Sequence, residues 1–284
     1  MESFPFYVHE TGDEFISTRI ARTGVWEPFE SSIMLSLLTP GDQVIDVGAN
    51  IGWYTLAAAH VVGAAGHVIA FEPEAANFSL LSANLSRNAV HCVTARCSAL
   101  GASIGSAQIE KSVTNKGDHR VRGMVPGATG SDSANDIAVE KLDDALRDVD
   151  AFNMERLRII KIDVQGYEAD VLRGATRLLQ TLPKRAIIFI EFDPELLRAN
   201  HSSSCDSLLE ILSSLDLNIL QICRPFWRLR RLTIADLRAS AVGGCESRDL
   251  ILAHHSQMHA LRLALPSVPR ALSSMAFIAA SRNQ

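Results

Sequence analysis

The stretch that decides the fold is Gly41-Asp42-Gln43-Val44-Ile45-Asp46-Val47-Gly48-Ala49-Asn50-Ile51-Gly52-Trp53-Tyr54-Thr55-Leu56. Its apolar run, residues 44–47, is too short for a helix and rich in β-branched side chains, which predicts a buried strand. Small residues then lead into residues 53–62, where apolar residues recur at helical spacing. A strand, a glycine-rich turn and a helix in this order expose free N–H groups at the helix start, where nucleotide-like ligands bind.

The glycine spacing distinguishes two classes of ligand. A dinucleotide-binding turn has the pattern Gly-x-Gly-x-x-Gly, and its second glycine admits a pyrophosphate. Here Ala49 and Asn50 follow Gly48 instead. The turn therefore argues against a pyrophosphate, although an NAD-dependent oxidoreductase on a related Rossmann-like fold stays an alternative.

Acidic residues follow three further predicted strands. Glu72 follows residues 67–71, Asp163 follows residues 157–162, and Glu191 follows residues 186–190. Ligands of an open parallel sheet bind beyond the carboxyl ends of its strands, so these acids and Asp46 are expected to face one crevice. Glu72 suits the 2′- and 3′-hydroxyls of an adenosine ribose, a contact that NAD and S-adenosylmethionine share. Asp163 and Glu191 are also candidates to hold a polar substrate or a divalent cation.

Two segments between the second and fourth strands are further candidates. After a third strand at residues 90–95, the small residues Ser98 and Ala99 would let a flat adenine ring lie against the backbone. Residues 104–137, rich in glycine, serine, asparagine and aspartate, predict a long loop of the kind that is often functional. That loop contains His119 beside Asp118, which we expect to orient the ring or raise its pKa.

Four motifs within residues 26–191 resemble the FkbM family of class I S-adenosylmethionine-dependent methyltransferases. They are the string from Asp46 to Thr55, the Ala-Leu-Gly at residues 99–101, the Asn-x-Gly-Asp-His-Arg at residues 115–120, and Lys-Ile-Asp-Val-Gln-Gly at residues 161–166. Gln165 stands where the family more often has glutamate. The resemblance implies an α/β, Rossmann-like class I methyltransferase fold with a seven-stranded, mostly parallel sheet and helices on both faces. It also implies methyl transfer from S-adenosylmethionine, usually to a hydroxyl.

The strand ends and the resemblance together define the expected site. Glu27 is expected at the cofactor's ammonium group, and His119 as the general base, because histidine titrates near neutrality; Asp163 is the second candidate base. The other expected cofactor contacts are Asp46, Gly48, Ala49, Asn50, Gly52, Tyr54, Thr55, Glu72, Pro73, Ser98, Ala99 and Asp163. The expected substrate contacts are Asn115, Asp118, Arg120, Gln165 and Glu191.

The expected function is O-methylation of a hydroxyl on a small molecule, either a natural product or a sugar-containing metabolite. An N-methyltransferase of small molecules and a non-catalytic module that kept the cofactor pocket are the alternatives on the same fold. A methyltransferase acting on nucleic-acid amines is disfavoured, because Asp163-Val-Gln-Gly replaces the expected Asn/Asp-Pro-Pro-Tyr/Phe. The net charge of -5 also gives no general attraction to a polyanion.

Composition and patterning set the expected layout of the chain. The 284 residues, 47% hydrophobic and 21% charged, predict one soluble globular α/β domain. A turn at Thr11-Gly12-Asp13 between two β-prone runs predicts a hairpin. We therefore expect an N-terminal β-hairpin extension over residues 1–25, the methyltransferase domain over 26–255, and a helical or partly ordered tail over 256–284.

Three further features bear on location and partners. Five cysteines without a Cys-x-x-Cys pair indicate reduced thiols, and no segment resembles a signal peptide or membrane span, so a cytoplasmic protein without membrane partners is expected. A homo-oligomer is compatible with the sequence. Arginines at positions 224, 228, 230 and 231 surround Trp227 and predict a solvated hairpin rim, with binding of an anionic or sugar-like substrate as the alternative.

Overall fold

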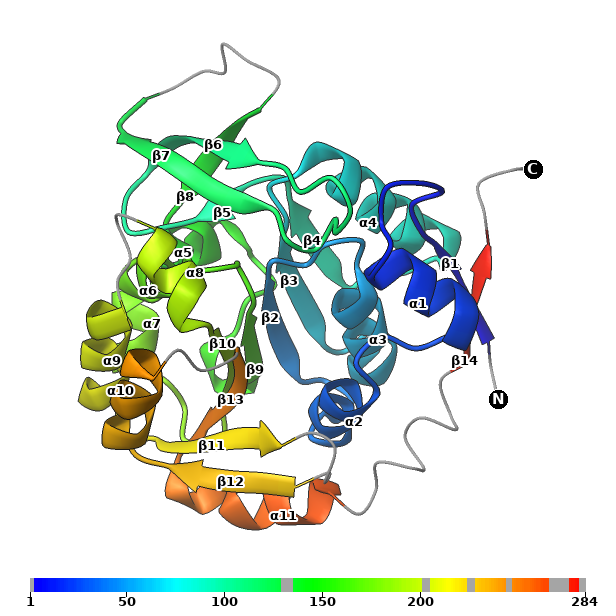
Figure 1. The fold of residues 1–284 in the computed structure, drawn as a ribbon. Coiled ribbons are helices and arrows are strands. Elements are labelled where there is room, and N and C mark those ends of the chain that lie inside the picture. The colour runs from blue at the N-terminus through cyan, green and yellow to red at the C-terminus, as the bar shows by residue number, and fades with distance from the viewer. Residues whose placement is uncertain are drawn as a thin grey trace.

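A computed structural model describes residues 3–128, 135–200, 205–223, 228–243, 247–265 and 276–280. Within these ranges the centre is an eight-stranded sheet with the strand order β12-β11-β13-β10-β9-β2-β3-β4 (Figure 1). The five strands from β10 to β4 run parallel, and β13 is antiparallel to both of its neighbours. The strands are β2 Gln43–Val47, β3 His67–Phe71, β4 Val93–Arg96, β9 Leu157–Ile162, β10 Ile187–Phe192, β11 Asn218–Cys223, β12 Arg228–Leu232 and β13 Arg248–Ala253.

Helices cover both faces of this sheet, because successive residues of a strand point to opposite sides. Ile159 packs in the core of one face and Ile160 in the core of the other. The first face is covered by α2 Pro28–Ser36, α3 Trp53–Val62, α4 Ala75–Arg87 and α11 Met258–Ala264. The second is covered by α5 Leu142–Ala145, α6 Glu168–Arg173, α7 Thr176–Gln180, α8 Pro194–Ala199, α9 Cys205–Ser214 and α10 Ile234–Val242. The predicted α/β fold is confirmed.

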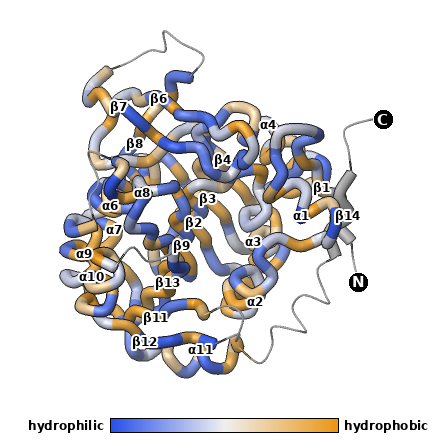
Figure 2. The backbone as a smooth tube through the Cα atoms, viewed as in Figure 1, coloured by the Kyte–Doolittle hydropathy of each residue, from blue (hydrophilic) through white to orange (hydrophobic). Residues whose placement is uncertain are grey.

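The expected count of seven strands is wrong by one, because β12 pairs antiparallel with β11 and extends the edge of the sheet. Arg228, Arg230 and Arg231 lie on β12 together with Leu229 and Leu232, and Figure 2 draws part of this strand in the blue of hydrophilic residues. Charged side chains on an edge strand discourage pairing with another chain. The other members of the predicted arginine arm, Arg224 and Trp227, lie outside the described residues.

The long loop predicted for residues 104–137 is wrong over most of its length. A second sheet stands there with the order β5-β8-β6-β7, formed by β5 Ala99–Leu100, β6 Gly105–Glu110, β7 Arg120–Pro126 and β8 Asp136–Glu140. In β6, Ala107 and Ile109 are buried whereas Gln108 and Glu110 are exposed. This short alternation is hidden by the polar composition around it. Residues 111–119, between β6 and β7, form a loop, the longest non-strand stretch of this region among the described residues (Figure 1).

The prediction of an N-terminal β-hairpin is also wrong. The described segment contains one strand, β1 Ser3–Tyr7, followed by the helix α1 Ile16–Thr23. Asp13 was expected in the hairpin turn, but its carboxylate accepts the backbone N–H of Ile16 at 3.3 Å and of Ser17 at 2.8 Å, which starts a helix. Ile16 and Ile20 then bury one face of that helix.

Strand β1 pairs instead with the C-terminal segment. It runs parallel to β14 Ala276–Ala280, so the two ends of the described chain lie side by side (Figure 1). The predicted tail thus contains the helix α11 and the strand β14, and its residues 266–275 and 281–284 lie outside the described part. Short 3-10 turns are η1 Leu146–Asp148, η2 Met154–Arg156 and η3 His255–Gln257. Among the described residues, no helix has the length and apolarity needed to cross a membrane.

Candidate active site

The turn between β2 and α3 is pressed against its neighbours at two glycines. Gly48 has φ +82°, and a Cβ there would lie 1.9 Å from the carbonyl oxygen of Asp163. Gly52 has φ +91°, and a Cβ there would lie 2.5 Å from Cδ1 of Leu81. Both positions therefore need glycine, for their left-handed backbone and for space. The result is a turn that lies directly on the end of β9.

Glu72, after β3, fastens the same turn. Its Oε2 accepts the backbone N–H of Asn50 at 2.8 Å, and its Oε1 accepts that of Glu74 at 2.9 Å. Burial raises the pKa of Glu72 to about 7, although these hydrogen bonds oppose the rise. Each carboxylate oxygen has a second lone pair, so Glu72 can still accept hydroxyls from a ligand.

Lys161 on β9 is a site residue that the sequence analysis missed. It pairs in register with Asp46 on β2, and its Nζ lies 2.9 Å from Oδ2 of Asp163 and 4.6 Å from the ring centroid of Tyr54. Burial acts to raise the pKa of Asp163, but the Lys161 ammonium outweighs it and holds that pKa below its ordinary value. Residues 157–162 are apolar except for Arg158 and Lys161, and a cation inside such a strand was the signal available in the sequence.

Asp46, Gly52 and Thr55, expected at the cofactor, lie behind the turn and face neither of the cavities described below. Thr55 donates its hydroxyl to Oδ2 of Asp46 at 2.6 Å, and both residues are buried. Burial raises the pKa of Asp46, and its Oδ1 has no hydrogen-bond partner within the described residues. These residues therefore support the turn on the side away from the two cavities.

The turn after β9 connects two acids through an amide. Nε2 of Gln165 donates to Oδ1 of Asp163 at 2.8 Å and to Oε2 of Glu191 at 2.9 Å, and Ser247 donates to Oε1 of Glu191 at 2.6 Å. Burial raises the pKa of Glu191 well above its ordinary value, and the nearby Asp163 adds to the rise. A donor amide stands where a divalent cation would have to lie between the two carboxylates. The residues present do not fit such an ion, and in the described ranges no three histidine, cysteine or acidic residues gather to hold one.

The loop over the site, residues 111–119, is hydrogen-bonded to the turn between β2 and α3. The carbonyl oxygen of Lys116 accepts the side-chain amides of Asn50 and Asn77, each at 3.0 Å. Lys111 also lies 2.7 Å from the carboxylate of Glu74. The loop therefore closes over the strand ends, as a catalytic role for His119 requires.

His119 is held differently from the expectation. Its Nδ1 accepts the backbone N–H of Ser112 at 3.0 Å, and burial lowers its pKa. Asp118 does not orient the ring, because its two carboxylate oxygens accept Nε and Nη2 of Arg120 at 2.9 and 3.0 Å. The expected partnership of Asp118 with His119 is wrong, since the bidentate arginine pair is the stronger interaction.

Two cavities meet at the turn. The inner chamber is lined by Gly48, Asn50, Glu72, Pro73, Ser98, Ala99, His119, Asp163 and Gln165, among others, and has a volume of about 50 Å³. The outer chamber, about 240 Å³, is lined by Glu27, Gly48, Ala49, Asn50, Tyr54, Asn115, Asp163, Gln165 and Glu191, among others. Asp118 and Arg120 line neither. In the outer chamber Oε2 of Glu27 accepts the Tyr54 hydroxyl at 2.8 Å.

These features define the class. A glycine turn after the first parallel strand, with acids at the carboxyl ends of the neighbouring strands, makes up a Rossmann-like fold, to which class I methyltransferases belong. More specifically, the chain belongs to the FkbM methyltransferase family, whose domain matches residues 46–221.

Two curated proteins are similar in sequence. The chain is 28% identical over 151 residues to AglP, a hexuronic acid methyltransferase of Haloferax volcanii, and 30% identical over 150 residues to Methyltransferase 1 of Beauveria bassiana. The matches cover 53% and 48% of this chain and 56% and 59% of those proteins. The chain thus spans just over half the length of the curated relatives it matches.

Solved structures are similar at lower identity. The FkbM methyltransferase of Methylobacillus flagellatus has a TM-score of 0.44 at 19% identity, over 81% of this chain and 46% of that one. The O-methyltransferase TomG of Streptomyces achromogenes, solved with S-adenosylmethionine, has a TM-score of 0.45 at 12% identity, over 80% of this chain and 79% of that one.

Proposed function

We propose that this chain transfers a methyl group from S-adenosylmethionine to a hydroxyl of a small molecule that contains a sugar. The observation that carries the proposal is the line of half-buried, hydrogen-bonded polar groups Asp163, Gln165 and Glu191. Asp163 and Gln165 line both chambers, and Glu191 lines the outer one. A cofactor in the inner chamber and an acceptor in the outer chamber would therefore come into contact at these residues. The similarity to a hexuronic acid methyltransferase supports a sugar-containing acceptor.

The inner chamber suits the adenosyl part of the cofactor. Glu72 supplies a carboxylate for two ribose hydroxyls, and Ala99 on β5 offers a flat, buried surface for adenine. In the outer chamber, Glu27 supplies a negative charge for the ammonium group. The unpartnered, buried Oδ1 of Asp46 lies beneath the turn and adds negative potential under a positively charged cofactor.

When bound, S-adenosylmethionine supplies an electrophilic methyl group. The chain's own contribution is to hold the acceptor hydroxyl in line at about 3–3.5 Å and to receive its proton. Asp163 is the favoured proton acceptor, because it faces both chambers and Lys161 keeps it ionised at neutral pH. His119 lies in the inner chamber beside the groups proposed for adenosine.

The proposal is tested with purified protein in two steps. Calorimetry measures binding of S-adenosylmethionine, and methyl-labelled cofactor is then incubated with hydroxyl-bearing glycosides and other small alcohols. We expect saturable cofactor binding and label recovered on an acceptor oxygen by mass spectrometry. Label on nitrogen would replace the proposal with N-methylation, and binding of NAD in place of S-adenosylmethionine would replace it with oxidoreductase chemistry.

A further inference from the structure

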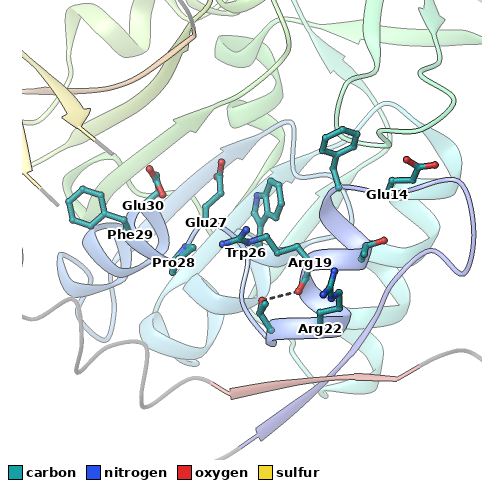
Figure 3. A pocket seen from close by; sticks show the side chains of 11 residues that line it. Glu14, Arg19, Arg22, Trp26, Glu27, Pro28, Phe29 and Glu30 are labelled. Carbon is teal, nitrogen blue, oxygen red and sulfur yellow. Dashed lines mark hydrogen bonds between the residues drawn. The ribbon is translucent and has the colours of Figure 1, made fainter. Parts of the chain in front are cut away.

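A groove of about 780 Å³ lies between α1 and α2, outside the two chambers (Figure 3). Phe15, Thr18, Arg19 and Arg22 contribute from one side of the groove, at the spacing of a single helix face, while the opposite face of α1 is buried through Ile16 and Ile20. Trp26 and the start of α2 form the other side. The groove is more than large enough for a sugar ring.

The groove continues into the outer chamber. Phe15, Trp26 and Glu27 line both cavities. The carboxyl group of Glu27 accepts the Tyr54 hydroxyl, and the ring of Tyr54 faces Lys161. A molecule in the groove therefore has a direct path to the line of polar groups where methyl transfer is proposed.

Two arginines, Arg19 and Arg22, and three acids, Glu14, Glu27 and Glu30, line the groove. Figure 3 shows the Arg19 side chain extending toward Trp26 and Arg22 lying on the same side, while Glu27 and Glu30 point away from both arginines. Both arginines are exposed, and among the described residues neither guanidinium forms an ion pair with a carboxylate. Two uncommitted guanidinium groups favour a carboxylate or another anion.

The apolar part of the groove suits a ring with C–H faces. Phe15 is 55% exposed, and Trp26 is half-buried in the same groove, so two aromatic side chains line it. Flat aromatic surface next to arginine side chains combines stacking with charge recognition.

We propose that the α1–α2 groove is the acceptor subsite and that it selects a sugar acid. The anionic group lies at Arg19 and Arg22, the ring lies on Trp26, and a hydroxyl reaches the outer chamber past Glu27. This inference rests on the proposed function, since it names the acceptor class for the same site.

A matched pair of ligands tests the charge requirement. Protein loaded with S-adenosylhomocysteine is titrated by calorimetry with p-nitrophenyl β-D-glucuronide and p-nitrophenyl β-D-glucoside. The two ligands differ only at C6, which is a carboxylate in the first and a hydroxymethyl group in the second. We expect the glucuronide to bind about tenfold tighter or more, the range of one charge-assisted hydrogen bond. Raising the salt concentration should narrow this ratio, because exposed charge pairs are screened.

Two double variants locate the effect. Arg19→Ala/Arg22→Ala should bring the glucuronide affinity close to that of the glucoside, with affinity for S-adenosylhomocysteine unchanged. The matched control, Arg238→Ala/Arg262→Ala, removes the same charge from exposed sites on α10 and α11 and should keep the preference. Equal affinity for the two ligands in the wild type, no binding of either, or a preference that survives the Arg19/Arg22 variant would overturn the inference.

The proposed function and the inference about the groove can be disproved independently of each other. A wild-type protein that does not bind S-adenosylhomocysteine would sink the methyl-transfer proposal. The glucuronide titration of the same protein without that ligand would still report on the groove.

Discussion

Glu168, on the first turn of α6, carries an electrostatic cost that the fold tolerates. It is buried, its Oε1 accepts the backbone N–H groups of Val164 and Gly166 at 3.3 and 3.2 Å, and its Oε2 has no hydrogen-bond partner among the described residues. Burial raises its pKa from 4.5 to about 7. The carboxyl group is therefore more favourably neutral in the folded state than in the unfolded state.

We expect Glu168→Gln to stabilise the protein at high pH. Below pH 4.5 the wild-type group is protonated in both states, and above about pH 7 the folded state must bury its charge. The advantage of the glutamine variant should grow between these values and reach on the order of 3 kcal/mol at pH 8. Thermal unfolding at pH 5 and pH 8 measures it. The prediction is wrong if the gain in melting temperature is as large at pH 5 as at pH 8.

Glu72 carries a pH prediction for the cofactor. Its pKa of about 7 means that the carboxylate is lost as the pH falls through neutrality, and the ionised form is the better acceptor for ribose hydroxyls. Wild-type affinity for S-adenosylmethionine should fall between pH 8 and pH 6. Glu72→Ala should lose about tenfold or more at pH 8 and show a flatter pH dependence. Calorimetry on a variant with unchanged circular dichroism checks this, and unaltered affinity would remove Glu72 from the site.

At the scale of elements, the turn after β9 makes a prediction about metals. The amide of Gln165 lies between Asp163 and Glu191 and donates to both, so a cation would have to displace it. Turnover should be unchanged after exhaustive treatment with EDTA and dialysis. A loss of turnover that Mg²⁺ or Mn²⁺ restores would show that Gln165 moves aside for a metal.

The loop 111–119 makes the second prediction at this scale. The inner chamber beneath it has a volume of about 50 Å³, whereas ligand sites usually measure about 300 Å³ or more. Binding of the adenosyl group should therefore shift the loop and disturb the two hydrogen bonds at Lys116. Amide hydrogen exchange over residues 111–119 should change on addition of S-adenosylhomocysteine. Exchange that changes elsewhere in the site but not in this loop would contradict the prediction.

The elements that the sequence predicted well are those whose signal is local. The helix at residues 53–62 and the strand at residues 67–71 have the predicted bounds, because their apolar periods are uninterrupted. The second sheet was missed because β6 and β7 are rich in polar residues and pair with each other across the loop 111–119. The helix α1 was missed because an aspartate that accepts N–H groups at a helix start cannot be told from a turn aspartate in the sequence. Asp13 is of the first kind.

At the scale of the whole molecule, the candidate site was predictable where parallel strands end. Their common direction brings Glu72, Asp163 and Glu191 to one edge of the sheet from distant parts of the chain. Three features depend on side-chain packing instead: the contacts of Lys161, the bidentate pair of Asp118 with Arg120, and the groove between α1 and α2. No spacing in one sequence encodes that packing, so these features needed the structure.

The assignment of the proton acceptor is the last prediction, and it depends on how the whole site divides between two chambers. Asp163 is kept ionised by Lys161, so a reaction that uses it should show a turnover number nearly independent of pH from about 6 to 8, with saturating cofactor. His119 has a lowered pKa and would be neutral over most of that range, so as the base it would impose a fall in turnover only toward acid pH.

The two candidates separate further through paired variants. Asp163→Asn should lower turnover by about 10²–10⁴-fold, the usual contribution of a general base. His119→Ala should lower turnover much less and instead weaken cofactor affinity, because His119 lines the inner chamber with Glu72. Steady-state kinetics of both variants, with cofactor affinity measured separately, decide between them. If His119→Ala loses turnover by two orders of magnitude and Asp163→Asn does not, the histidine reaches the acceptor from the inner chamber and the loop 111–119 must carry it there.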